Sequence, residues 1–165
     1  MPNPKLLRQI PDLKEGFAVR SATAQDIWTI RKLVLSELLD PTQLRWSQFW
    51  VIVHHQEIIA CGQLRNFPEA QEFGSLVVSP HWRGQGMGLF LTQWLIQQAT
   101  LPLYLECLGD RRAAFYTKFD FIPVSLSDLP QSLQQKFRLS ALGKRLIRLP
   151  IHFMHCPIET ITETR

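Results

Sequence analysis

Hydrophobic and polar positions along the chain recur with two different periods. Apolar residues three and four positions apart predict helices at 27–38, 86–100, 111–119 and 130–147. Short runs rich in β-branched and aromatic residues predict strands at 17–20, 49–54, 58–64, 72–79, 103–107, 121–124 and 151–156. Thr23 and Asp26 give the first helix a start that resembles a capping box, and Pro41 stops that helix.

The order of these elements indicates the fold class. Three strands follow one another between residues 49 and 79 with no helix between them, so a purely parallel, doubly wound sheet does not fit. We predict a mixed α/β (α+β) domain with a mostly antiparallel central sheet of about six or seven strands and helices on both faces. This domain is expected at 17–156, with a flexible N-terminal arm at 1–16 and a C-terminal tail at 157–165.

Composition narrows the class of protein. Of 165 residues, 45% are hydrophobic and 19% are charged, which is typical of a globular domain and excludes disorder. No apolar run approaches the 18 residues that a membrane span needs. Three cysteines do not make a disulfide framework, so we expect a reducing, cytoplasmic location. The net charge of +4 favours anionic ligands without selecting one.

The most informative stretch runs from Leu76 to Leu89 and reads LVVSPHWRGQGMGL. A buried strand ends at a proline, and three alternate glycines lead into a helix. Glycines let backbone N–H groups approach a ligand, and a helix start adds unpaired N–H groups and partial positive charge, so the stretch predicts a phosphate site. The Walker and dinucleotide patterns both fail here, because no Lys-Ser/Thr pair follows and position 89 is Leu.

The pattern R-x-x-G-x-G, as Arg83, Gly86 and Gly88, resembles the pyrophosphate-binding turn of the GCN5-related N-acetyltransferases (GNAT). The preceding L-x-V-x-P at Leu76, Val78 and Pro80 is similar to that family too. The resemblance implies a sheet splayed at the cofactor site and acetyl-CoA as the acyl donor. It also implies a backbone N–H near Val78 that faces the thioester oxygen. The implied cofactor-binding residues are Leu76, Val77, Val78, Arg83, Gly84, Gln85, Gly86, Met87 and Gly88.

The resemblance continues around Tyr116 and implies that this residue is the general acid that protonates the departing thiolate. The alternative is an amphipathic core residue with its hydroxyl at the surface. The chain departs from the family pattern nearby, at Gly109, Arg112 and Asp120. Asp120 stands where the family usually has glycine, and Asp tolerates the left-handed backbone that such a turn needs.

The general base is less defined by the sequence. Glu72 begins its strand on the same alternating face as Gly74 and Leu76, and related enzymes often place there a glutamate that takes the amine proton through water. The alternative for Glu72 is a solvated carboxylate at a strand end. Glu106 on the next strand is a second candidate, and an acceptor amine that is already neutral needs no base.

The resemblance implies N-acetyl transfer to a primary amine, from a small molecule or a protein. Two alternatives stay open: a catalytically weak CoA-binding module, and a nucleic-acid or membrane-surface protein that uses the basic residues of 136–148. We favour a solvated helix face for those residues and do not expect nucleic acid as a partner. We expect no metal site, because His152 and His155 point to opposite faces of a strand. A homodimer is left open.

Overall fold

The computed structural model describes residues 10, 12–39, 41–143 and 148–157 of the chain. Seven strands form one sheet in the order β1-β2-β3-β4-β5-β7-β6. The strands are β1 (Phe17–Ser21), β2 (Phe49–His54), β3 (Glu57–Asn66), β4 (Gln71–Val78), β5 (Leu103–Leu108), β6 (Ile122–Val124) and β7 (Ile151–Cys156). The helices are α1 (Ile27–Ser36), α2 (Met87–Gln98), α3 (Asp110–Thr117) and α4 (Gln131–Gly143).

The strand pairing confirms the predicted mixed sheet. Strands β1–β2, β2–β3, β5–β7 and β7–β6 pair antiparallel, whereas β4 and β5 pair parallel through Gln71 with Leu103 and Glu72 with Tyr104. The chain forms two compact units, which are described separately. The first holds the described residues of 10–65 and 73–98, and the second holds 66–72 and the described residues from 99 onwards.

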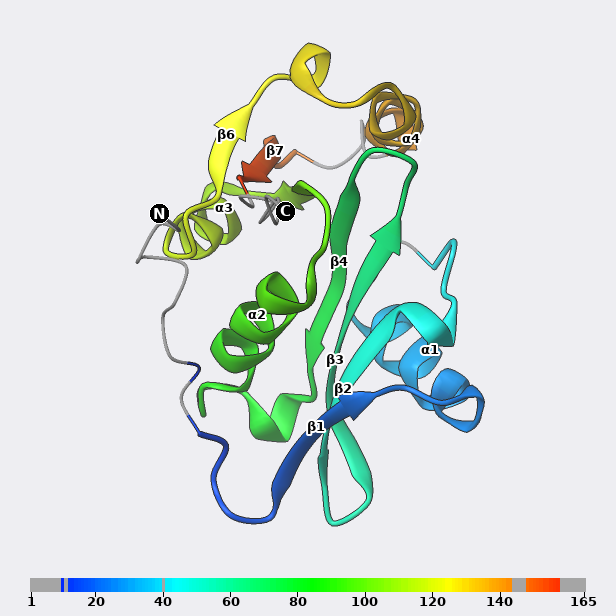
Figure 1. The fold of residues 1–165 in the computed structure, drawn as a ribbon, viewed down its shortest axis with the longest axis vertical. Helices are drawn as coiled ribbons and strands as arrows, with labels where there is room; N and C mark the ends of the chain where they lie inside the picture. The colour runs from blue at the N-terminus through cyan, green and yellow to red at the C-terminus, as the bar shows by residue number, and fades with distance from the viewer. Residues whose placement is uncertain (1–9, 11, 40, 144–147, 158–165) are drawn as a thin grey trace, which may run out of the picture. The chain divides into compact units, whose positions relative to one another are not determined.

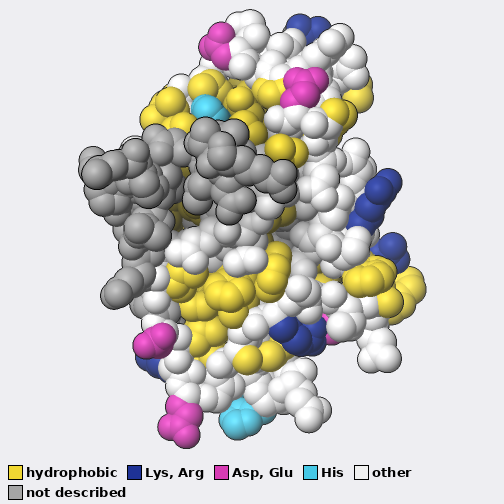
Figure 2. All heavy atoms as spheres, viewed as in Figure 1, with side chains coloured by type: hydrophobic (Ala, Val, Ile, Leu, Met, Phe, Trp, Pro, Cys, Tyr) yellow, Lys and Arg dark blue, Asp and Glu magenta, His cyan; other side chains and the backbone are white. Residues whose placement is uncertain are grey.

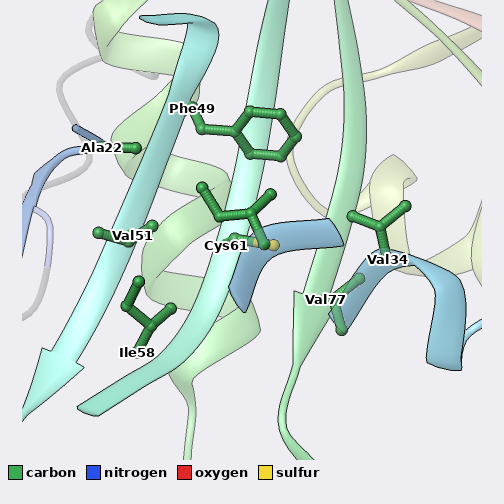
Figure 3. Close-up of a cluster of buried hydrophobic side chains, with 8 residues drawn as sticks. Ala22, Val34, Phe49, Val51, Ile58, Cys61 and Val77 are labelled. Atoms are coloured by element: carbon green, nitrogen blue, oxygen red, sulfur yellow. The ribbon is translucent and has the colours of Figure 1, made fainter. Parts of the chain in front are cut away.

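In the first unit, helices α1 and α2 cover opposite faces of the strands (Figure 1). On the α1 face, Ile30 and Val34 pack with Val51, Cys61 and Val77 (Figure 3). On the other face, Gly62 of β3 leaves room for α2, because a Cβ there would lie 2.5 Å from Leu95 Cδ1. Burial of these apolar side chains on both faces holds the unit together.

Helix α2 is apolar on more than its core side. Hydrophobic side chains gather in the region of this helix on the face seen in Figure 2. Leu89, which is 46% exposed, is the large exposed hydrophobic residue of α2.

The hairpin between β2 and β3 turns on two residues, whereas the predicted strands at 49–54 and 58–64 leave three residues between them. His55 and Gln56 have φ of +45° and +69°, and His54 pairs with Glu57. Two consecutive left-handed residues define the type I′ turn, whose twist matches the flanking strands. Neither residue is the Asn or Gly that normally indicates this turn, so its form was not evident from the sequence.

In the second unit, helix α4 packs its apolar side over one face of the sheet. Leu129, Leu133 and Phe137 form a buried cluster with Ala70. Tyr104 and Phe153 pack against this cluster, and the Phe137 and Phe153 rings stack with centroids 5.5 Å apart. The predicted helix at 130–147 is thus confirmed as far as Gly143, and 144–147 lie outside the described residues.

Two local predictions from the sequence are confirmed. Asp120 adopts a left-handed conformation with φ +65°, as expected where a glycine is usual. The start of the first helix is held by Asp26, whose carboxylate accepts from the Thr23 backbone N–H at 2.6 Å. Arg20 adds two hydrogen bonds to the same carboxylate, at 2.7 and 3.1 Å. The Arg20 bonds lower the Asp26 pKa from 3.8 to about 2.

Replacing Asp26 should therefore destabilise the protein in a pH-dependent way. A depressed carboxyl pKa stabilises the fold above the unfolded value of 3.8, and this contribution is lost as pH falls towards about 2. Asp26→Asn should lower the free energy of unfolding by about 1 kcal/mol at pH 7, since the pair is partly exposed. Urea unfolding at pH 7 and at pH 2.5 measures this difference, which should shrink at the lower pH.

Asp128→Asn is the matched control. Asp128 accepts the same kinds of bond from the Ser125 backbone and hydroxyl, and among the described residues it forms no ion pair. Its replacement should cost less at pH 7 than that of Asp26. Equal losses in the two variants would show that the Arg20 pair adds nothing.

Candidate functional site

The glycine-rich turn after β4 is shaped by backbone conformation and not by crowding. Gly84 and Gly86 have φ of +74° and +85°, in the region that L side chains rarely adopt. A Cβ at either position would meet nothing within 4 Å. The turn therefore leaves open space beside its backbone, into which a ligand can approach.

Helix α2 begins directly after this turn. Phe90 N–H donates to the Gly86 carbonyl at 2.9 Å and thereby starts the helical hydrogen-bond pattern. N–H groups before that point have no acceptor in the helix and carry its partial positive charge. Gly88 has no left-handed φ, and a Cβ there would make an ordinary 3.7 Å contact with Val78 Cγ2. Two of the three glycines are thus required by conformation, and the arrangement suits a phosphate group.

Arg83 is tied down at the edge of the turn. Its Nε donates to the Val78 carbonyl at 3.0 Å, and its Nη2 forms an ion pair with Glu37, the residue after α1. The Arg83 side chain is 49% exposed. An anionic ligand at the turn therefore meets a guanidinium that is already oriented along the end of β4.

The hydrogen bonds at the end of β4 show in which direction its backbone N–H groups point. Ser79 N–H donates to the Ile59 carbonyl of β3 at 2.8 Å. Successive N–H groups of a strand point to opposite edges. The Val78 N–H therefore points away from β3, as a donor for a ligand must.

The expected alternation of side chains along β4 is wrong beyond its first residues. Gly74 was expected to share a face with Leu76. A Cβ on Gly74 would clash with the Arg65 guanidinium, whereas Leu76 lies beside Gly62 on the α2 face. Arg65 and Gly62 are three residues apart on β3 and so face opposite sides. An irregularity at Ser75, with φ +50°, separates the two residues.

Glu72 is not a solvated carboxylate at a strand end. Its side chain is 6% exposed and forms an ion pair with Lys136 of α4, whose side chain is 13% exposed. The assignment of Lys136 to a solvated helix face is wrong for the same reason. The structure thus brings a primary ammonium into contact with the predicted base, a pairing that the sequence did not indicate.

The second candidate base, Glu106, faces the same helix. Ser140 Oγ of α4 donates to Glu106 Oε1 at 3.0 Å. Ser140 lies one helical turn beyond Lys136, so one side of α4 serves both carboxylates. Two strands therefore direct acidic side chains towards α4 within the second unit.

Tyr116 lies on α3 and is half-buried, with its ring against Phe115 and Phe121 at 5.1 and 5.7 Å between centroids. Burial raises the pKa of its phenol, and neighbouring Cys107 raises it further. The phenol consequently keeps its proton at neutral and moderately alkaline pH. Cys107 and Tyr104 are three residues apart on β5 and therefore face opposite sides of the strand. Tyr116 lies on the Cys107 side, whereas Glu72 is the register partner of Tyr104 and lies on the other side.

His155 stacks on the other tyrosine. The rings of His155 and Tyr104 lie 4.4 Å apart between centroids and 14° from parallel, and burial lowers the His155 pKa. His152, three residues earlier, instead pairs with Asp110 at 2.8 Å. No group of three or more metal-ligating side chains occurs among the residues that the structure describes. Over the same residues, no helix is long and apolar enough to cross a bilayer.

Comparison with known proteins finds a family whose model matches part of this chain. Residues 45–123 match a family model described as Acetyltransferase (GNAT) domain. This segment begins before β2 and ends within β6, so it includes the glycine-rich turn, Glu72 and Tyr116.

Solved structures share the fold at low sequence identity. N-acetylglutamate synthase from Neisseria gonorrhoeae, in complex with coenzyme A and N-acetyl-glutamate, is 21% identical with a TM-score of 0.70. The match covers 88% of this chain and 36% of that one. Rv2747 from Mycobacterium tuberculosis, also in complex with CoA, is 18% identical with a TM-score of 0.67, over 86% and 99% of the two chains. The ribosomal-protein-S18-alanine N-acetyltransferase from Escherichia coli is 14% identical with a TM-score of 0.65, and the match covers 90% of this chain and 98% of that one.

Proposed function

Because residues 45–123 match the GNAT acetyltransferase domain, we propose that this chain is an acetyltransferase of that family and transfers an acetyl group from acetyl-CoA to a primary amine. The observation that carries the proposal is the turn from Arg83 to Gly88. Two left-handed glycines, an oriented guanidinium and a helix start form an anion site that suits the CoA pyrophosphate. Solved structures with this fold that were crystallised with CoA support the choice of cofactor.

In the proposed reaction the neutral amine attacks the thioester carbonyl and forms a C–N bond. Negative charge develops on the carbonyl oxygen, and the Val78 N–H is the donor assigned to it. A donor placed in this way contributes about 3 kcal/mol to the transition state. The C–S bond then breaks, and Tyr116 gives its proton to the departing thiolate. Glu72 receives the amine proton, directly or through water.

The acceptor is proposed to be an amine that is cationic before it reacts. Lys136 shows that a primary ammonium fits against Glu72, and its side chain holds the position that an acceptor ammonium would take. Among proteins with this fold, one is named N-acetylglutamate synthase and one ribosomal-protein-S18-alanine N-acetyltransferase. Free amino acids and peptides with a free N-terminus are therefore the first acceptors to test, with polyamines and lysine side chains after them.

The direct test is calorimetric titration with acetyl-CoA beside adenosine nucleotides that lack the pantetheine arm. Saturable micromolar binding that prefers acetyl-CoA is expected, followed by amine-dependent release of thiol. Binding without turnover on any amine would favour the catalytically weak CoA-binding module. Absence of binding would overturn the proposal.

Gly86→Glu should abolish acetyl-CoA binding, because it places a carboxylate in the phosphate site. Affinity should fall at least a hundredfold in calorimetry. Gly109→Glu is the matched control, since Gly109 also has a left-handed φ, of +84°, and open space before the start of a helix. The control places the same charge at another glycine with a left-handed φ, and its affinity for acetyl-CoA should match that of the wild type. Equal affinity in both variants would place the phosphates elsewhere.

Tyr116→Phe should lower kcat about a hundredfold while the affinity for acetyl-CoA changes little. The wild-type rate should show no alkaline fall from loss of this acid below about pH 10, because the pKa of the phenol is raised. Tyr104→Phe is the control, as it removes the other hydroxyl and keeps the ring that stacks on His155. Steady-state kinetics of the wild type and both variants from pH 6 to 10 measures these effects. An unchanged rate in Tyr116→Phe would remove Tyr116 from the mechanism.

Glu72→Gln should lower kcat/KM for the acceptor ten- to a hundredfold at neutral pH. The deficit should narrow as pH rises, because more of the acceptor amine is then neutral without help. Glu106→Gln is the matched variant, since it alters the other carboxylate that faces α4. A deficit in Glu106→Gln and none in Glu72→Gln would move the base to Glu106.

A further inference from the structure

Strand β4 contains a bulge at Gly74 and Ser75. Ser75 has φ +50°, in the left-handed region that a non-glycine residue occupies only at a cost in free energy. Ser75 Oγ lies 3.0 Å from Arg65 Nη2, and a Cβ on Gly74 would also meet the Arg65 guanidinium. Two consecutive residues thus face the same side chain of the neighbouring strand, which is the signature of a β-bulge.

Three side chains of β3 satisfy the groups around this bulge. Cys61, Gln63 and Arg65 alternate along one face of the strand and are 0%, 0% and 4% exposed. We call them the β3 polar row. Cys61 Sγ donates to the Ser75 carbonyl at 3.7 Å, so it contacts the backbone of the bulge itself.

The Ser75 hydroxyl is held by the other two residues of the row. It accepts from Arg65 Nη2 at 3.0 Å and donates to Gln63 Oε1 at 3.3 Å. Gln63 Nε2 donates in turn to the Gln43 carbonyl at 2.8 Å and to Gln48 Oε1 at 3.1 Å. One buried amide therefore connects the bulge to the segment between α1 and β2.

This network bears on the reacting groups through the backbone. The bulge lies three residues before Val78, and Val77 between them is buried in the core on the α1 side, which restricts the peptide units on either side of it. A network of buried hydrogen bonds restricts such a conformation and makes it more rigid. A displacement of the bulge would move the Val78 N–H by a similar amount.

We propose that Gln63 and Arg65, acting through the Ser75 hydroxyl, are positioning residues for acetyl transfer. They hold the bulge so that the Val78 N–H stays aimed at the thioester oxygen while negative charge develops there. The inference rests on the proposed function and deepens it, because it assigns the precision of that donor to buried side chains on β3. A misplacement of about 1 Å can cost a hundredfold in rate.

Two substitutions of Ser75 separate positioning from stability. Ser75→Ala removes the hydroxyl and keeps a side chain in the left-handed conformation. Ser75→Gly also removes the hydroxyl but relieves the strain, so its thermal midpoint should exceed that of Ser75→Ala. If the hydroxyl positions the bulge, kcat should fall about tenfold to a hundredfold in both variants, with the Kd for acetyl-CoA within about twofold of the wild type.

Carbonyl-labelled [¹³C]acetyl-CoA provides a direct readout. A hydrogen bond to the thioester oxygen lowers the stretching frequency of the bound carbonyl, which difference infrared spectroscopy measures. The wild type should show this shift, and Ser75→Gly and Gln63→Met should lose most of it. A purely structural role of the row would leave the shift intact in every variant that still folds.

The outcomes separate the two proposals. A stable Ser75→Gly variant that binds acetyl-CoA, with reduced kcat and a reduced carbonyl shift, supports the positioning role. A Ser75→Gly variant as fast as the wild type overturns that role and leaves the proposed acetyl transfer standing. A wild-type protein that does not bind acetyl-CoA overturns the proposed function and this inference with it.

Discussion

The geometry of the candidate cofactor segment depends on the break in regular strand structure at Ser75. A continuous β4 would keep Gly74 and Leu76 on one face, whereas the bulge puts Leu76 on the α2 face and Val77 in the α1 core. The left-handed conformation of Ser75 is itself costly, so the bulge needs support from its surroundings. The β3 polar row gives that support, because Cys61 Sγ donates to the Ser75 carbonyl while Gln63 and Arg65 hold the Ser75 hydroxyl.

The features that could be predicted from the sequence are those set by neighbouring residues. Two of the three glycines of the 84–88 turn adopt the left-handed conformation, and Asp120 replaces a glycine without losing its turn. The bulge could not be predicted in this way. Ser75 is not a glycine, and Cys61, Gln63 and Arg65 alternate with apolar residues just as any half-buried strand does. Their role appears only when β3 and β4 lie side by side.

Lys136 illustrates a second limit of the sequence. Apolar spacing located α4 correctly, but it could not say which charged residue at the border of the apolar stripe turns inward. Glu72 precedes Lys136 by 64 positions, so neither residue gives a local sign of the other. Leu133 and Phe137 of α4 are buried, whereas Leu139 is 72% exposed. Lys136 therefore lies where the buried side of the helix meets the exposed side. A long aliphatic stem lets lysine lie along such a border. In Lys136 the ammonium then turns inward, because Glu72 pairs with it.

The ion pair also bears on which acceptors the proposed site favours. Removing one partner of a buried pair leaves an uncompensated charge and costs several kcal/mol. In the proposed reaction, a cationic acceptor that displaced Lys136 would keep Glu72 paired, and the long stem of Lys136 would have to carry its own ammonium towards solvent. A neutral nucleophile such as an alcohol brings no charge with which Glu72 could pair. The proposed site is therefore expected to favour cationic amines over neutral nucleophiles.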